Sequence, residues 1–125
     1  MISITKIFKF SAAHWLSNHN GLCKNLHGHN YKLEITVKGD VKNKPDTSDV
    51  GMVMDFGVMK EIVRINVVRR LDHQSLNRFF PNPTCELMVE WVVNTLRSCF
   101  LSRGVRLEKV RLWETDTCYA EWKEC

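Results

Sequence analysis

Two histidines and a cysteine stand close together near the start of the chain, in the segment Cys23-Lys24-Asn25-Leu26-His27-Gly28-His29. The histidines lie two residues apart, so on a β-strand their side chains share one face. Apolar and polar residues then alternate, which predicts a strand over residues 27–38 with both histidines on its apolar face. Because zinc takes neutral imidazole readily, this pair predicts a metal site. The alternative is two buried histidines with satisfied hydrogen bonds.

A catalytic zinc takes three protein ligands and one open position, and His14 is in position to be the third. Residues 2–14 also alternate, and only Lys6 breaks the apolar series at even positions. On a regular strand His14 therefore ends the face that carries Phe8 and Phe10. If the two strands pair antiparallel, the three imidazoles come together. The polar connection between them predicts a loop in which His19 faces solvent.

The middle of the chain predicts two helices. Asp55 is a suitable N-cap, and apolar residues at helical spacing predict an amphipathic helix over residues 56–70. Thr84 is in position to cap a second helix that ends before Gly104, with Glu86 in its first turn.

Alternation returns near the end of the chain and predicts strands over residues 108–114 and 118–123. Val110, Leu112 and Glu114 share a face, so a carboxylate ends an apolar strand face. The order of two strands, two helices and two strands predicts an α+β fold, with a four-stranded antiparallel sheet and both helices on one face. Nothing in so short a chain covers the other face, which indicates burial against other subunits.

The composition predicts one domain over residues 1–125, with 44% hydrophobic and 26% charged residues. The net charge of +4 is spread along the chain, which argues against a nucleic-acid partner. No apolar run approaches the roughly 20 residues of a membrane span, so no membrane partner is expected. Five cysteines without a Cys-x-x-Cys pair, and no signal peptide, favour a reduced, cytoplasmic setting.

Six short motifs occur in order between about residue 7 and residue 120. They are Phe10-Ser11-Ala12-Ala13-His14, Cys23-x-x-x-His27-Gly28-His29-Asn30-Tyr31, Gly51-Met52-Val53-x-Asp55-Phe56, Leu71-Asp72-His73-x-x-Leu76-Asn77, Pro83-Thr84-x-Glu86 and Glu114-Thr115. Together they resemble the 6-pyruvoyltetrahydropterin synthase family. The Cys-x-x-x-His-Gly-His spacing resembles its bacterial queuosine-pathway branch, the 6-carboxytetrahydropterin synthases. The chain departs from that pattern at Trp15, where Arg is usual, and at Leu87, where many relatives carry Asn.

The resemblance implies the tunnelling fold, in which the sheets of several subunits join into a barrel. It also implies a homohexamer of two trimers with active sites at subunit interfaces. The implied substrate is 7,8-dihydroneopterin triphosphate. The carboxy branch converts it to 6-carboxy-5,6,7,8-tetrahydropterin and releases triphosphate and acetaldehyde. The implied cofactor is zinc, bound by His14, His27 and His29, which acts on the side-chain hydroxyls as a Lewis acid.

Three residues are implied to move protons. A metal nearby lowers the pKa of a thiol, so Cys23 is the expected base. Its alternative role is a fourth, closing zinc ligand. Asp72-His73 resembles the family's relay pair, in which Asp72 orients the imidazole and His73 exchanges protons. The alternative for this pair is a helix C-terminal turn with local hydrogen bonds.

Three further residues are implied to bind the pterin. Glu114 resembles the family's anchor, because a carboxylate can accept the amino group and ring N–H of a pterin edge together. Its alternative is a strand-end acid that faces solvent. Thr84 and Glu86 are expected to line the same pocket, or to serve only as helix cap and dipole-compensating acid. No residue is assigned to the triphosphate, for which Lys24, Arg69 and Arg70 are the candidates.

Two competing functions remain at the level of the sequence. One is pyruvoyl synthase activity, in which triphosphate is eliminated without carbon–carbon cleavage. The other is a zinc-stabilised binding module without catalysis. That second hypothesis leaves Asp72-His73 and Glu114 without a purpose.

Overall fold

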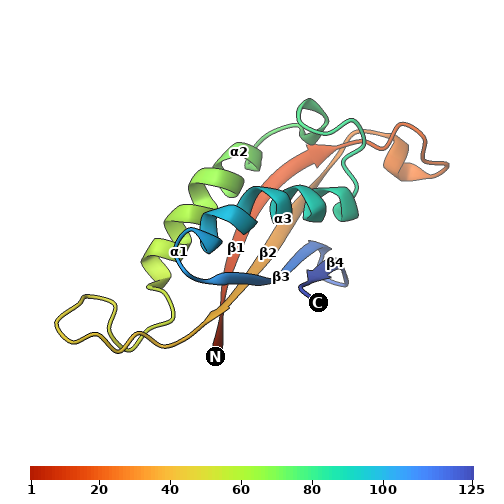
Figure 1. Cartoon of the computed structure of the whole chain (residues 1–125). Coiled ribbons are helices and arrows are strands. Elements are labelled where there is room, and N and C mark those ends of the chain that lie inside the picture. The colour runs from red at the N-terminus through yellow and green to blue at the C-terminus, as the bar shows by residue number, and fades with distance from the viewer.

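The computed structural model describes residues 1–125 and contains one four-stranded antiparallel sheet with the strand order β1-β2-β3-β4 (Figure 1). The strands are β1 (Ile2–His14), β2 (His27–Gly39), β3 (Arg106–Thr115) and β4 (Cys118–Lys123). All four predicted strands are therefore present, and β3 is slightly longer than predicted. Strands adjacent in the sheet follow one another in the chain, and the connection between β2 and β3, residues 40–105, contains both helical runs.

The first two strands pair along their whole length, from Ile2 opposite Gly39 to His14 opposite His27. Ala12 lies opposite His29 in the same register. Since directly opposite residues share a face, this pairing brings the three predicted metal ligands to one end and one face of the sheet.

The predicted first helix is one continuous helical run, but it is not α-helical throughout. It consists of α1 (Phe56–Val63), a π-helical segment, η2 (Arg64–Val68), and α2 (Arg69–Leu71). In the middle of the run the Asn66 side chain donates a hydrogen bond to the Ile62 carbonyl at 2.8 Å. Asp55 caps the start, as predicted, by accepting from the Gly57 N–H at 2.6 Å.

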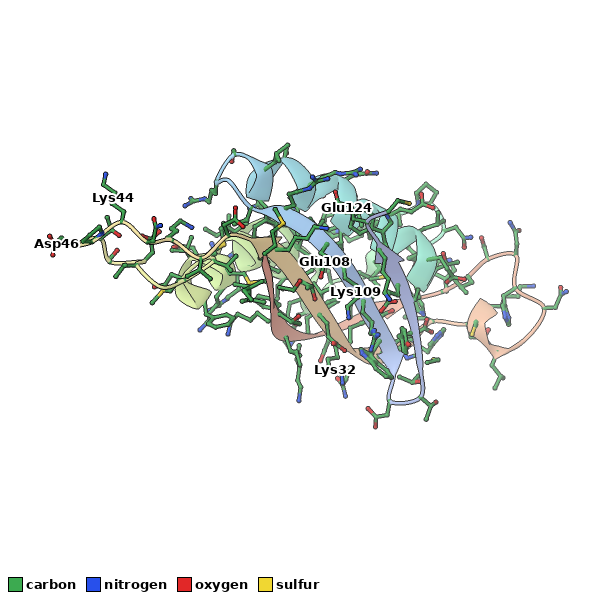
Figure 2. The ribbon with its side chains drawn as sticks, turned by 60° about the horizontal axis from the view of Figure 1, so that its bottom comes forward. Lys32, Lys44, Asp46, Glu108, Lys109 and Glu124 are labelled. Carbon is green, nitrogen blue, oxygen red and sulfur yellow. The ribbon has the colours of Figure 1, made fainter.

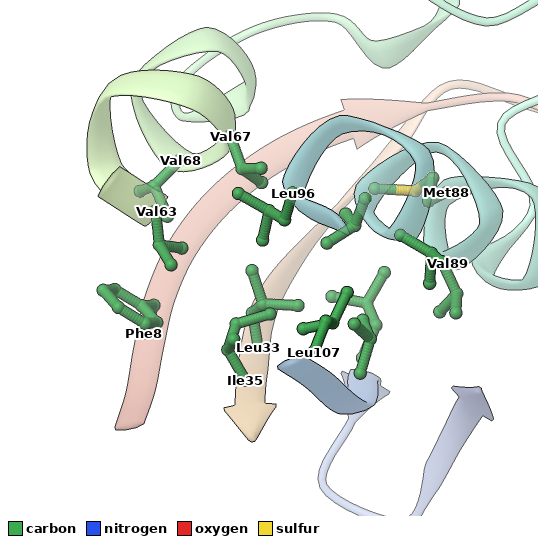
Figure 3. Close-up of a cluster of buried hydrophobic side chains, with 14 of the residues drawn as sticks. Phe8, Leu33, Ile35, Val63, Val67, Val68, Met88, Val89, Leu96 and Leu107 are labelled. Atoms are coloured by element: carbon green, nitrogen blue, oxygen red, sulfur yellow. The ribbon is translucent and has the colours of Figure 1, made fainter. Parts of the chain in front are cut away.

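The second helix is α3 (Cys85–Leu101), which Thr84 caps as predicted by accepting from the Leu87 N–H at 3.2 Å. Both helical runs lie on the same face of the sheet (Figure 1). Figure 3 shows the core between them, where β2 contributes Leu33 and Ile35. Opposite these lie Val63 and Val67 from the first helical run and Met88, Val89 and Leu96 from α3.

The other face of the sheet is polar, and Figure 2 shows Lys32, Glu108 and Lys109 on its strands. One edge is β1, whose last residues are lined by the segment 73–75. There the Ala13 N–H donates to the Gln74 carbonyl at 3.0 Å, and the His73 N–H donates to the Ser11 carbonyl at 2.6 Å. The first half of β1 has no strand on its outer side. No helix has both the length and the apolar character needed to cross a membrane.

Candidate metal centre and active site

The strand pairing brings His14, His27 and His29 together, as the alternation predicted. The Nε2 atoms of His14 and His27 are 3.0 Å apart. One ligand atom from each histidine and one from Glu114 all lie within 4.8 Å of one another. His14 is almost completely buried, at 1% exposure, whereas the other three side chains are partly accessible. This geometry is that of a metal site open on one side.

Backbone carbonyls orient two of the imidazoles. The His14 Nδ1–H donates to the Pro83 carbonyl at 2.8 Å, and the His27 Nδ1–H donates to the Asn25 carbonyl at 2.7 Å. Since a carbonyl can only accept, each Nδ1 carries the proton and each Nε2 presents a lone pair to the centre. Two lone pairs that face each other at 3.0 Å repel, and a cation bound between them would relieve the repulsion. Such outer hydrogen bonds are typical of metal-binding histidines.

His29 completes the donor set. Its Nε2 is buried without a hydrogen-bond partner and lies 3.0 Å from Glu114 Oε1. Burial lowers the pKa of His29 below its usual value, against the opposing effect of the Glu114 carboxylate. A neutral imidazole with an unpaired, inward nitrogen is the form that binds a metal. The three histidines therefore fit zinc in donor type.

Glu114 faces inward at the end of β3, which excludes the solvent-facing alternative. In the β2–β3 register Lys32 lies opposite Trp113, so Glu114, the next residue of β3, lies toward His29. The sequence predicted the inward carboxylate but not its place beside the imidazoles, 3.9 Å from His14 Nε2. The position of Glu114 beside the imidazoles depends on the register between β2 and β3, which the alternation within each strand does not predict.

A pocket beside this centre contains Glu114 together with Glu86. Its lining residues come from the start of α3 and from the β3–β4 hairpin: Cys85, Glu86, Glu114, Cys118, Tyr119, Ala120 and Glu121. Thr84 is not among them; it caps α3, and its neighbour Pro83 holds His14. The Pro83-Thr84 segment thus positions the metal ligand and starts the helix that carries Glu86.

Tyr31 lies under the centre and was not singled out from the sequence. Its ring stacks on Phe10 at 5.0 Å between centroids and lies 5.6 Å from the His29 ring. The hydroxyl is buried without a hydrogen-bond partner, and burial raises the pKa of Tyr31 well above its usual value. The tyrosine therefore stays neutral, and its ring forms the apolar floor of the site.

Asp72 and His73 form a pair, with Asp72 Oδ1 2.9 Å from His73 Nδ1. The same oxygen accepts from the Ser11 N–H at 3.0 Å, and this bond is the main cause that lowers the pKa of Asp72. His73 adopts a left-handed backbone conformation, with φ of 59°, and its side chain is 82% exposed. The pair lies outside the histidine cluster, in a pocket that Ser11 and Asn30 also line on the polar face of the sheet.

Cys23 lies in the loop between β1 and β2, within a short 3-10 turn (Leu22–Lys24). Its side chain is partly buried and lies outside the cluster of four ligand atoms. The geometry of one subunit therefore gives no support to the closing-ligand alternative. His19 is exposed in the same loop, as predicted. Trp15 is held through its backbone, which donates to and accepts from the Asn77 side chain, each at 3.0 Å.

Residues 3–125 match the family model for 6-pyruvoyl tetrahydropterin synthase. The chain belongs to this family. The 6-carboxy-5,6,7,8-tetrahydropterin synthase of Synechocystis sp. is 38% identical, over 95% of this chain and 91% of that protein. A family relative with another name, the dihydroneopterin monophosphate aldolase of Pyrococcus furiosus, is 39% identical over 71% of this chain and 70% of its own.

A solved structure agrees with the family assignment. The 6-pyruvoyl tetrahydropterin synthase of Caenorhabditis elegans superposes with a TM-score of 0.82 at 27% identity, covering 99% of this chain and 96% of that one. The predicted tunnelling fold of the 6-pyruvoyltetrahydropterin synthase family is therefore confirmed for the subunit. Members of the family carry three different names, so membership alone does not fix the reaction.

Proposed function

We propose that the protein is a zinc-dependent lyase that converts 7,8-dihydroneopterin triphosphate to 6-carboxy-5,6,7,8-tetrahydropterin, with release of acetaldehyde and triphosphate. This is the reaction of the queuosine-pathway branch. The observation that carries the proposal is the convergence of three imidazole side chains beside a pocket lined by three carboxylates, Glu86, Glu114 and Glu121. The 38% identity to a 6-carboxytetrahydropterin synthase supports this branch.

Zinc, when bound by His14, His27 and His29, would supply Lewis acidity toward the hydroxyls of the substrate side chain. The chain's own residues do the rest. Glu114, with Glu86 on the same pocket wall, binds the amino and N–H edge of the pterin. Burial of the centre against Tyr31 keeps the local dielectric low, which strengthens these polar contacts.

Proton transfer is assigned to Cys23 and to the Asp72-His73 pair. Asp72 accepts from the His73 Nδ1–H, which leaves His73 Nε2 free to take up or release a proton at the exposed end of the ring. Cys23 acts as the base toward a side-chain carbon of the substrate.

The proposed active site is shared between subunits. Within one subunit, Asp72-His73 opens to the polar face of the sheet, whereas the metal centre and its pocket lie on the helix-covered face. The first half of β1 is free to pair with a strand of another subunit, and in the proposed assembly the pair of one subunit lies toward the metal centre of the next. A homohexamer of two trimers, with the sheets closed into a barrel, supplies such contacts.

Mass spectrometry of the products tests the proposed reaction directly. The zinc-loaded protein is incubated with 7,8-dihydroneopterin triphosphate, and the expected products are 6-carboxytetrahydropterin and acetaldehyde. A pyruvoyl product without acetaldehyde would assign the protein to the pyruvoyl branch instead. Failure to convert the substrate, with zinc bound, would support a binding module without catalysis.

Replacement of the thiol tests the proton-transfer assignment. Cys23→Ala is expected to keep zinc and pterin binding and to lose product formation, whereas the matched Cys125→Ala change, at the exposed C-terminal residue, is expected to keep it. Full product formation by Cys23→Ala would remove the assignment of Cys23 as base.

A further inference from the structure

Two lysines stand directly opposite each other on the polar face of the sheet. The β1–β2 register pairs Lys9 with Lys32, so their side chains leave the same face at neighbouring positions. Like charges in this arrangement destabilise a sheet. A negative charge close to the two ammonium groups would relieve this repulsion.

The sheet contains two other cross-strand pairs of cations, and both have carboxylate partners. In the pair Lys38–Arg106, both members reach Glu124, and Lys38 also reaches Glu108. In the pair Lys109–Lys123, Lys123 reaches Glu121 at 3.9 Å.

Lys9 and Lys32 differ from these pairs because neither of them is within 4.0 Å of a carboxylate oxygen. The Lys32 ammonium lies over the Trp113 ring, 4.5 Å from its centroid, which holds it in place without neutralising it. The structure thus contains one cross-strand cation pair without an anion.

Both lysines line a pocket of about 750 Å³, which also contains Asp72, His73 and Trp113. Neither of the pocket's two carboxylates neutralises the lysines. Asp72 is engaged by the Ser11 N–H and by His73, and Asp116, on the β3–β4 turn, does not come within 4.0 Å of either ammonium. An anion bound between the lysines would lie in the same pocket as the proposed proton-relay pair.

We infer that Lys9 and Lys32 bind the triphosphate of the pterin substrate. The inference rests on the proposed function, which supplies a polyanionic chain next to the carbons where His73 acts. A triphosphate has several anionic oxygens, so it can bridge two ammonium groups and relieve their repulsion. The repulsion between the two lysines therefore destabilises the sheet only while no anion is bound.

The test compares two ligands that differ only in the triphosphate. Dissociation constants for 7,8-dihydroneopterin and for its triphosphate are measured by calorimetry with zinc-loaded protein in a Cys23→Ala background, which prevents turnover. The parent is expected to prefer the triphosphate. Lys9→Gln or Lys32→Gln should each reduce this preference by about tenfold and leave dihydroneopterin binding unchanged.

Lys109→Gln is the matched control, because it removes one lysine from another cross-strand pair on the same face. It should leave both dissociation constants unchanged. The unfolding temperature of the Lys9 variant should not fall, since this substitution removes a like-charge contact.

Two results would overturn the inference, and they are distinguishable. If dihydroneopterin binds and both lysine variants keep the full preference for the triphosphate, the lysines are not the triphosphate site and the proposed function stands. If neither ligand binds to the parent, the proposed function fails together with the inference.

Discussion

At the scale of single residues, the candidate centre depends on backbone atoms that a sequence pattern does not reveal. His14 and His27 present their Nε2 atoms because the carbonyls of Pro83 and Asn25 accept from the opposite ring nitrogens. The residue types and their alternation predicted which histidines meet. The tautomers follow from loop conformations at residues 25 and 83, and only the folded chain sets these.

Asp72 makes a pH-dependent contribution to stability whose sign follows from its environment. The Ser11 N–H and His73 lower the folded-state pKa of Asp72 below the unfolded value, near 3.9. The contribution is therefore fully present above the unfolded value and is lost as the pH falls through the folded-state pKa.

We predict that Asp72→Asn lowers the free energy of unfolding at pH 7, and that the difference from wild type shrinks toward pH 3. Urea titrations at both pH values measure this. Asp116→Asn, at an exposed carboxylate without an ion pair, is the control. An equal difference at both pH values would show that the carboxylate charge makes no contribution.

At the scale of elements, the alternation and the caps predicted most of the fold. The four strands and both N-caps follow from local patterns, and the ranges differ from prediction by only a few residues. The π-helical segment at Arg64–Val68 was missed, because a helical apolar period of 56–70 does not distinguish α from π turns. The place of Glu114 was missed because it depends on how β2 and β3 align.

Thr84 is predicted to stabilise α3 through its cap. Thr84→Ala should lower the free energy of unfolding by about 1 kcal/mol, because the Leu87 N–H loses its acceptor. Thr84→Ser keeps the hydroxyl and should retain most of the stability. Chemical denaturation measures both variants, and equal losses in the two would contradict a capping role.

At the scale of the whole molecule, the subunit separates the groups that the proposed reaction would combine. The metal centre belongs to the helix-covered face, and Asp72-His73 opens to the polar face beside the edge strand β1. An uncovered sheet face, buried against other subunits, was predicted from the short chain, and the structure shows that this face is polar (Figure 2). The position of Asp72-His73 on this face was not predicted, because the loop after α2 bends back beside β1 through contacts distant in sequence.

Mixed assemblies test whether subunits share an active site. His27→Gln and His73→Gln proteins should each be inactive alone. Unfolded together in equal amounts and refolded, they should recover about a quarter of wild-type activity, since one interface in four then combines an intact centre with an intact relay. Continued inactivity of a mixture that does form joint assemblies would place the complete site within one subunit.

The central claim is that His14, His27 and His29 hold a zinc ion, and metal content tests it most directly. Inductively coupled plasma mass spectrometry of the purified protein should find about one zinc per subunit in wild type. The same content is expected in His19→Gln, because the exposed His19 lies outside the cluster. His27→Gln should lose most of the metal while remaining folded by circular dichroism. A full equivalent of zinc in folded His27→Gln would contradict the account.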